Sequence, residues 1–383
     1  MVESQGDPRQ SARMDFRGRV LLAPLTKGGN LPFRRLCLQH GCEVTMSEMA
    51  YAYQVVKRSK SELALLRKHA DETCFGVQIA ASKAPDAIAA GLAAVERGAS
   101  WIDLNCGCPI HDVVKRGMGA TLLQRPQHLA RLVGEMVKAL PVPVSVKIRL
   151  GWAEDDQNAS EVARLVEEAG AAALCVHGRT REQRYSRAAD WDAIARIAAE
   201  RSIPVIGNGD LLTWYETHER WRTSGVASVM LGRGALMKPW LFREVAEKKA
   251  WEPDAEQRLG ILFDLASKMK VHFRDDEKGR ERTMRFLPWH LGFFCRYRPL
   301  SGERWEAASR QHPLIQTRMP DDEVDLPVLE QLLRDARPEV HQRLADLLWE
   351  SPDAEQATAR ALLLAVEMPP VAGEAPEVAT AHG

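Results

Sequence analysis

An apolar strand that ends in a cysteine is encoded at residues 101–109, Trp101-Ile102-Asp103-Leu104-Asn105-Cys106-Gly107-Cys108-Pro109. Gly107 and Pro109 fix the turn around Cys108, and the glycine-rich stretch 115–120 follows and can cover it. A thiol held at the end of a strand can give a proton to a bound ring or take one from it. The stretch therefore predicts a reactive group at a strand end, with Cys108 as the catalytic cysteine and Cys106 as a structural one.

Polar residues also end several other apolar runs of the first 250 residues. Eight runs are predicted as strands, at 20–23, 44–47, 75–79, 101–105, 144–149, 173–176, 204–208 and 228–232. Segments with helical periodicity lie between them, at 32–40, 84–97, 126–140, 158–169, 191–200 and 213–224. Eight strand–helix units in about 240 residues predict an α/β fold, a (β/α)8 TIM barrel over 19–250. A doubly wound sheet is the alternative. The barrel is preferred because the polar clusters follow nearly all of the strands rather than one switch point.

The pattern becomes helical after Trp251. Residues 251–350 are predicted to form a smaller all-helical domain of four or five helices, and 351–367 one more helix. The Pro/Ala/Glu-rich remainder of 351–383 predicts a disordered acidic tail. Residues 1–18 form a polar N-terminal segment without a signal-peptide core.

Composition limits the class of protein. The chain has 383 residues, of which 27% are charged, and a formal net charge of zero. Seven cysteines without paired spacing predict a reducing compartment, the cytoplasm, and no apolar run approaches the roughly 20 residues that cross a bilayer. Residues 270–310 contain ten Lys or Arg against six Asp or Glu, whereas 320–383 contain four against fourteen. The basic stretch suits a polyanionic partner, although an ordinary solvated helix surface explains it equally well.

Two pairs of polar side chains belong to the central predicted strands. The amides of Gln78 and Asn105 can both donate and accept, which suits the edge of a flavin or a pyrimidine, although each alone is more often a loop residue. Lys147 and Arg149 point the same way along one strand. Two cations in a barrel mouth predict an anionic ligand, or else salt bridges to Asp103 or a neighbouring strand.

The later strands end in residues suited to a nucleotide. His177 is followed by Arg179 and Tyr185, which can hold a ring and its phosphates. In a barrel, phosphate is commonly bound by the loops after the last two strands. Those loops here contain Asn208, Gly209, Asp210, Gly232 and Arg233. No metal is predicted, because no second cysteine pair or close histidine completes a ligand set around Cys106 and Cys108.

These motifs resemble the signature of the FMN-dependent tRNA-dihydrouridine synthases. The resemblance rests on Asn105…Gly107-Cys108-Pro109, Val146-Lys147-Ile148-Arg149, His177-Gly178-Arg179-Thr180…Tyr185, Gly207-Asn208-Gly209-Asp210 and Leu231-Gly232-Arg233. The sequence is most similar to the eukaryotic tRNA-dihydrouridine(47) synthase branch. The stretches that carry this are Ala23-Pro24-Leu25-Thr26, Ser47-Glu48-Met49-Ala50, the doubled cysteine, Arg285-Phe286-Leu287 and Phe294-Cys295-Arg296-Tyr297.

The resemblance implies an NAD(P)H-dependent flavin oxidoreductase, with FMN in the barrel mouth, NADPH or NADH as reductant, and a tRNA uridine flipped into the site. Hydride would pass from N5 of reduced FMN to C6 of uracil, and Cys108 would give a proton to C5. The residues implied to contact FMN are Pro24, Leu25, Gln78, Lys147, His177, Asn208, Gly209, Asp210, Gly232 and Arg233. Those implied to hold the uridine are Asn105, Arg149, Arg179 and Tyr185. The helical domain would bind the tRNA, and the protein would act as a monomer.

Two other functions are compatible with a flavin-type barrel. One is an FMN-dependent reductase of a free pyrimidine, similar to dihydroorotate dehydrogenase, although a small substrate would not need the helical domain with its basic stretch. The other is a non-catalytic RNA-binding barrel. A barrel without catalytic activity is expected to have lost the cysteine or the phosphate loops, whereas this sequence contains both.

Overall fold

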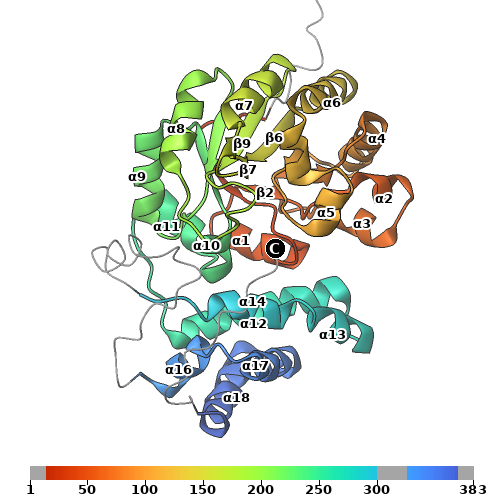
Figure 1. Cartoon of the computed structure of the whole chain (residues 1–383). Helices are drawn as coiled ribbons and strands as arrows, with labels where there is room; N and C mark the ends of the chain where they lie inside the picture. The colour runs from red at the N-terminus through yellow and green to blue at the C-terminus, as the bar shows by residue number, and fades with distance from the viewer. Residues whose placement is uncertain (1–13, 300–325, 370–383) are drawn as a thin grey trace, which may run out of the picture.

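The barrel contains eight parallel strands. The computed structural model of the protein describes residues 14–299 and 326–369 (Figure 1). The barrel strands are β1 (Val20–Leu22), β2 (Val44–Met46), β4 (Cys74–Ala80), β5 (Trp101–Cys106), β6 (Val144–Arg149), β9 (Ala173–His177), β10 (Val205–Asn208) and β11 (Ser228–Leu231). Strand β2 pairs with both β1 and β4, so the sheet closes on itself. The TIM-barrel prediction is confirmed, and the doubly wound alternative is wrong because an open sheet would leave two of these strands as edges.

The register of the strands brings the predicted polar residues together. Asn105 lies beside Lys147 on the neighbouring strand, and Arg149 lies beside His177, which in turn lies beside Asn208. Because all the strands run in the same direction, their C-terminal ends meet at one face of the barrel, where barrel enzymes carry their active sites.

Helices cover the outside of the barrel (Figure 1). They are α1 (Leu31–Gln39), α4 (Ala84–Val95), α6 (Pro126–Ala139), α7 (Ala159–Glu168), α8 (Trp191–Glu200) and α9 (Trp214–Ser224). Most of them bury an apolar face, as α6 does with Leu129, Leu132, Val133 and Met136, whereas the buried residues of α9 are Thr217 and Ser224. After α9 the chain turns at Gly225, whose φ of 66° is left-handed and therefore favours glycine.

Several short elements at the rim of the barrel were not predicted. They are β3 (Ala50–Tyr51), α2 (Ala52–Val56) and α3 (Lys60–Leu65) before β4, α5 (His111–Lys115) and the 3-10 helix η2 (Gly119–Gln124) after β5, and the hairpin β7 (Gly151–Ala153) and β8 (Asp156–Gln157) after β6. Each is too short to carry a detectable period in the sequence.

The described residues after β11 are helical and contain no strand. They form α10 (Arg233–Met237), α11 (Leu241–Glu247), α12 (Ala255–Phe273), α13 (Glu277–Thr283), α14 (Leu287–Phe294), α16 (Val328–Arg334), α17 (Pro338–Glu350) and α18 (Ala354–Glu367). Helices α12 and α14 lie next to α1 of the barrel (Figure 1). One apolar core extends from Leu22 of β1 through Leu262 of α12 to Leu344 of α17. The division into domains near residue 250 stays a prediction.

Two predicted segments lie outside the described residues. They are residues 1–13 of the polar N-terminal segment and the acidic tail from residue 370. Within residues 14–299 and 326–369, no helix combines the length and the hydropathy that crossing a membrane requires.

Candidate active site

A cavity of about 610 Å³ opens at the C-terminal ends of the barrel strands. This volume falls within the roughly 300–1,000 Å³ of typical cofactor and ligand sites. Every site residue predicted from the sequence lines the cavity except Arg179. The predicted residues that line it are Pro24, Leu25, Gln78, Asn105, Cys108, Lys147, Arg149, His177, Tyr185, Asn208, Gly209, Asp210, Gly232 and Arg233.

The turn that carries Cys108 is held by a side chain and by a close backbone contact. The side-chain oxygen of Asn105 accepts hydrogen bonds from the backbone N–H of Gly107 (3.2 Å) and of Cys108 (2.9 Å). Gly119 returns over the turn with φ of 61°, and a Cβ on it would lie 2.7 Å from the Cys108 carbonyl oxygen. The backbone that carries the thiol is therefore fixed by residues on both sides of it in the sequence.

Cys108 and Cys106 differ in accessibility. Cys108 is half-buried and lines the cavity, whereas Cys106 is fully buried in the core. Burial raises the pKa of the Cys108 thiol, and the cations Arg149 and Lys147 oppose the shift only in part. Cys108 is consequently a protonated thiol at neutral pH, which is the form that can donate a proton.

A chain of buried polar side chains stands behind Asn105. Its amide nitrogen donates to the Gln78 side-chain oxygen (2.8 Å), and the Gln78 amide donates to the Asp103 carboxylate (2.7 Å). The Ser145 hydroxyl donates to the same carboxylate (2.5 Å). Burial raises the pKa of Asp103, against the effect of these hydrogen bonds and of Lys147. Asp103 was missed as a positioning residue because it looks like one position of an apolar strand.

The two predicted cations extend into the cavity. Lys147 donates to the side-chain oxygen of Asn208 (3.2 Å), and Arg149 donates to two backbone carbonyls at 2.9 and 3.0 Å. Within the described part of the chain, neither forms an ion pair with Asp103 or any other carboxylate. Two cations with neutral partners only, in a largely buried site, favour an anionic ligand.

Arg179 differs from the other predicted site residues because it does not line the cavity. Its side chain is fully buried behind the cavity and forms two hydrogen bonds to the Asp210 carboxylate, at 2.6 and 2.7 Å. It also lies 3.1 Å from Nε2 of His177. These contacts position Asp210 and His177, and the direct contact of Arg179 with the uridine stays a prediction.

Electrostatics at this side of the cavity are dominated by cations. Burial lowers the pKa of Arg233 to about 10, although Tyr185 and Asp210 oppose the shift. Burial and then Arg149 and other nearby cations lower the pKa of His177 well below its usual value, so its imidazole is neutral. Burial alone would raise the pKa of Tyr185, but the surrounding cations, Arg233 first, lower it. The guanidinium of Arg233 lies 3.8 Å from the centre of the Tyr185 ring.

Glycines bring the backbone close to the cavity after β10 and β11. Gly209 has φ of 133°, and a Cβ there would lie 2.5 Å from the Cβ of Ala189. Its carbonyl accepts a hydrogen bond from the Trp191 indole (3.0 Å). A Cβ on Gly234 would lie 2.3 Å from the Leu211 carbonyl oxygen. Larger residues are excluded at both positions, and backbone N–H groups in such loops are typical phosphate ligands.

Helix α14 contributes residues that the sequence did not predict for the site. Trp289 and Phe293 line the cavity from one face of α14, and Arg296, just after the helix, lines it too. A Cβ on Gly28, after β1, would lie 2.8 Å from the Trp289 ring, so the loop fits closely against the helix. The spacing of four between Trp289 and Phe293 could have predicted that the two share a face of the helix. No local signal in the sequence predicts that this face meets the barrel mouth.

The cysteines and acidic residues form no metal centre in the part of the chain that the structure describes. All seven cysteines are free. No group of three or more His, Cys, Asp or Glu side chains among the described residues could hold a metal ion.

Comparison with known proteins identifies the family. The sequence model described as Dihydrouridine synthase (Dus) matches residues 21–293. A human protein named tRNA-dihydrouridine(47) synthase (NAD(P)+)-like is 40% identical over 296 residues, which are 76% of this chain and 45% of that protein. A Coprinopsis cinerea tRNA-dihydrouridine(47) synthase is 40% identical over 307 residues, which are 76% of this chain and 45% of that protein. The chain thus spans less than half the length of these curated relatives. It belongs to the dihydrouridine synthase family.

Proposed function

We propose that this protein reduces a uridine of tRNA to 5,6-dihydrouridine, with FMN as cofactor and NADPH or NADH as reductant. The observation that carries the proposal is the protonated Cys108 thiol, held by Asn105 at the edge of a cavity lined with cations. Its relatives in human and in Coprinopsis cinerea are named for this reaction on tRNA and for NAD(P).

The residues present fit FMN. Lys147 and Arg149 have neutral partners only, which suits the negative charge of a reduced flavin. The cavity is large enough for the ring system, and Gly209 and Gly234 line it after β10 and β11, where barrel loops commonly bind phosphate. We propose that FMN is held by Pro24, Leu25, Gln78, Lys147, His177, Asn208, Gly209, Asp210, Gly232 and Arg233.

The chemistry of the chain itself centres on one proton. When bound and reduced by NAD(P)H, FMN would supply the hydride for C6 of the uracil. Cys108 donates the proton that forms the new C–H bond at C5, and its own S–H bond breaks. The thiolate that results is stabilised by Arg149 and Lys147, and it takes a proton from solvent before the next turnover.

Four other residues are proposed to fix the Cys108 turn or to hold the base. Asn105 fixes the Cys108 turn and, with Arg149 and Tyr185, is proposed to hold the uracil. Arg179 is proposed to hold the uracil as well, and it also positions Asp210 and His177.

The reducible base is proposed to be part of an RNA rather than a free pyrimidine. The names of the relatives favour tRNA, and they make position 47 the first to examine. The helical region with its basic stretch supports the same choice. We propose further that the protein acts as a monomer in the cytoplasm, which size-exclusion chromatography and cell fractionation would test.

The test uses the full-length protein and unmodified tRNA. The purified protein should carry the absorbance of bound flavin and, given NADPH, should form dihydrouridine that nucleoside mass spectrometry detects. Cys108→Ala should keep the flavin and its reduction by NADPH but lose most dihydrouridine formation, whereas Cys106→Ala should keep substantial activity. A wild-type protein that reduces free uracil or orotate but no tRNA would contradict the proposal.

A further inference from the structure

A second cleft lies between the barrel and the C-terminal helices. It is bounded by α1, by the loop before β4, by the end of α4 and by the end of α12, and its volume is about 430 Å³. No described residue lines both this cleft and the active-site cavity. Its polar lining consists of Arg35, Arg67, Lys68, His69, Arg97 and His272.

Positive charge in this cleft exceeds negative charge. The described residues that line it include no Asp or Glu. Asp71, beside it, pairs with Arg35 (3.4 Å) and with Nδ1 of His69 (3.0 Å). Arg67 and Lys68 form no ion pair with any described carboxylate, and Arg97 has only a long, exposed contact with Glu96 (4.0 Å). Burial and then the surrounding cations, Arg67 first, lower the pKa of His272 to about 4. The cleft therefore carries an excess of positive charge that an anion could neutralise.

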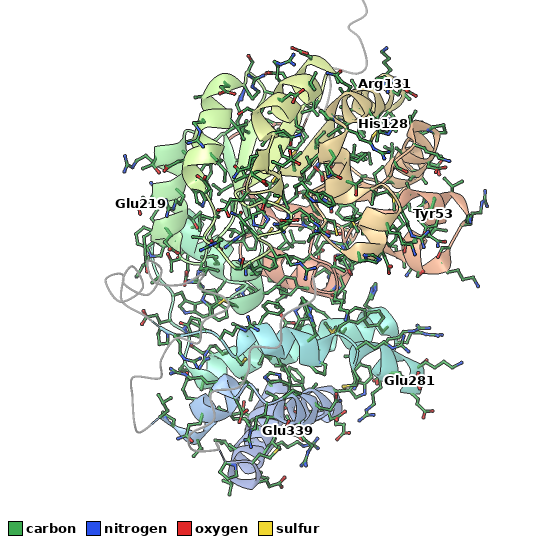
Figure 2. The ribbon with its side chains drawn as sticks, in the orientation of Figure 1. Tyr53, His128, Arg131, Glu219, Glu281 and Glu339 are labelled. Atoms are coloured by element: carbon green, nitrogen blue, oxygen red, sulfur yellow. The ribbon has the colours of Figure 1, made fainter. Side chains whose placement is uncertain are left out.

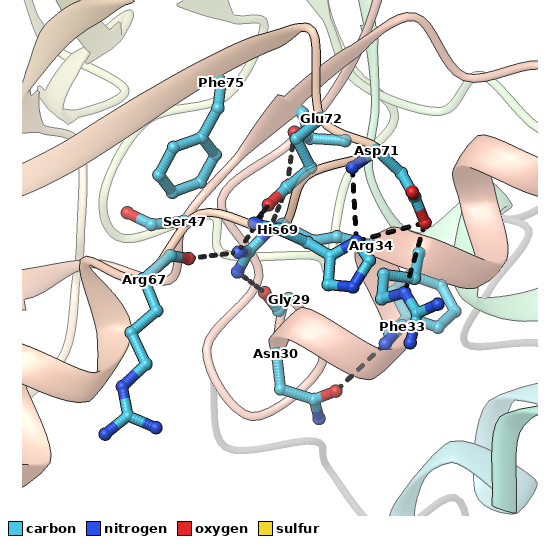
Figure 3. Close-up of polar contacts among 12 residues, drawn as sticks. Gly29, Asn30, Phe33, Arg34, Ser47, Arg67, His69, Asp71, Glu72 and Phe75 are labelled. Atoms are coloured by element: carbon cyan, nitrogen blue, oxygen red, sulfur yellow. Dashed lines mark hydrogen bonds and ion pairs between the residues drawn. The ribbon is translucent and has the colours of Figure 1, made fainter. Parts of the chain in front are cut away.

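A buried ion pair supports the loop that carries these cations. Arg34 and Glu72 are 2% and 0% exposed and lie 2.6 Å apart. Arg34 also donates to the Arg67 carbonyl (2.8 Å), and Glu72 accepts from the backbone N–H of His69 (2.7 Å). The Arg67 carbonyl faces this pair while its guanidinium points away from it (Figure 3). The backbone of the loop is thus fixed before any ligand binds, which lowers the entropic cost of binding.

The same cleft offers apolar surface beside its charges. Val271 on α12 lines it with 77% of its surface exposed, and Leu31 at the start of α1 lines it too. A Cβ on Gly98 would lie 3.2 Å from the Lys68 side chain, so the loop and the end of α4 are in close contact. Arg and Lys side chains are common ligands of nucleic-acid phosphates, and the apolar side chains beside them are free to contact a sugar or a base.

We propose that this cleft binds the phosphate backbone of the RNA substrate, apart from the uridine that enters the active-site cavity. The proposal rests on the proposed function, because it deepens the contact with the same tRNA. Arg67, Lys68 and Arg97 are the phosphate ligands, and Val271 contacts a sugar or a base. Backbone contacts of this kind strengthen binding without choosing the sequence.

The experiment removes the three cations and measures how RNA binding depends on salt. The variant is Arg67→Ala/Lys68→Ala/Arg97→Ala in the full-length protein. Its matched control, Arg131→Ala/Lys138→Ala/Arg220→Ala, removes three exposed cations from α6 and α9. Arg131 lies far from the C-terminal helices (Figure 2). The dissociation constant of unmodified tRNA is measured at salt concentrations from about 50 to 200 mM. Melting temperature and flavin absorbance check that both proteins fold.

The expected result is a smaller salt dependence in the cleft variant alone. Each lost phosphate contact lowers the slope of log K against log salt by about 0.7 to 0.9, so three contacts lower it by about 2 to 3. At about 100 mM salt this corresponds to a loss of affinity on the order of a hundredfold. Equal slopes in the two triple variants overturn the proposal. If the cleft variant does not fold, Lys68→Ala and Arg97→Ala alone should each lower the slope by about 0.8, and an unchanged slope in both overturns it.

Two further readouts separate the possible causes of failure. Calorimetric titration with inorganic phosphate tests a small anion. Phosphate binding that is lost in the cleft variant while its RNA slope stays normal assigns the cleft to that anion and overturns the RNA proposal. Dihydrouridine formation by the wild-type protein tests the proposed function. If the wild type forms none while the cleft variant still loses RNA affinity, the reaction assignment fails and the cleft as an RNA-binding site is supported.

Discussion

The thiol of Cys108 has a protonation state set by its immediate surroundings. Because burial raises its pKa, the proton is present at neutral pH and is lost only as the pH rises through that raised value. We therefore expect the single-turnover rate of tRNA reduction to stay flat to at least about pH 8.5, the ordinary value for a thiol, and to fall above it. Flavin reduction by NADPH over the same pH range is the control. A tRNA rate that falls with a midpoint near pH 7 would mean that the cations dominate over burial.

The ion pair of Arg34 and Glu72 makes a prediction about stability at the same scale. Glu72→Gln keeps the shape of the side chain but leaves the Arg34 guanidinium buried without its counter-charge. Removing one partner of a buried pair costs about 3–5 kcal/mol, and we expect that loss in the free energy of unfolding by urea. Glu43→Gln is the control, since its pair with Arg19 is 69% and 44% exposed and should cost less than about 1 kcal/mol. Equal losses in the two variants would contradict the argument.

Among the elements, α14 connects the helical region to the reaction. Trp289→Ala removes an aromatic wall of the active-site cavity, and base–aromatic stacking contributes about 1–3 kcal/mol. We expect KM for tRNA to rise on the order of tenfold while the bound flavin is retained. Trp214→Ala on the outer helix α9 is the matched control, because Trp214 does not line the cavity. A loss of flavin without a change in KM would assign Trp289 to the cofactor instead.

Gly28→Ala tests the same contact from the barrel side. The added Cβ would lie 2.8 Å from the Trp289 ring, so either the loop or α14 must shift. We expect this variant to raise KM for tRNA in the direction of Trp289→Ala, with little added effect when the two changes are combined. Steady-state kinetics of the double-mutant cycle measure this, and fully additive effects would mean that the two residues act separately.

The elements that the sequence predicted are those with a period of their own. Strand β5 and helix α6 repeat their apolar residues at spacings of two and of three to four, so each can be located without knowledge of its neighbours. Strand β3 has two residues and hence no period. The position of the Arg179 side chain could not be predicted either, because it depends on a contact with Asp210, a residue of the next βα unit. Trp289 comes from a helix far along the chain, whose place over the barrel mouth depends on tertiary packing alone.

In the molecule as a whole, the barrel and the C-terminal helices share one apolar core. Phe33 of α1 stacks on His290 of α14 with ring centres 4.8 Å apart, and α12 packs along α1. The active-site cavity and the cationic cleft both lie along this junction, so both need the two parts to stay together. The predicted boundary near residue 250 therefore marks a change in the type of secondary structure. It does not imply that the barrel and the C-terminal helices fold independently.

The shared core leads to a prediction about unfolding. Leu262 on α12 is 1% exposed within the core that also contains the barrel strands. We expect calorimetry to record one transition, with calorimetric and van't Hoff enthalpies nearly equal, although chains of more than about 150 residues often unfold in steps. Leu262→Ala should lower stability by about 2–5 kcal/mol and move that whole transition, while Leu363→Ala, at a position 66% exposed on α18, should barely move it. Two transitions, of which Leu262→Ala moves only one, would mean that the helices unfold apart from the barrel. The cleft and the α14 wall could then open without loss of the flavin site, because that site is formed mostly by the barrel.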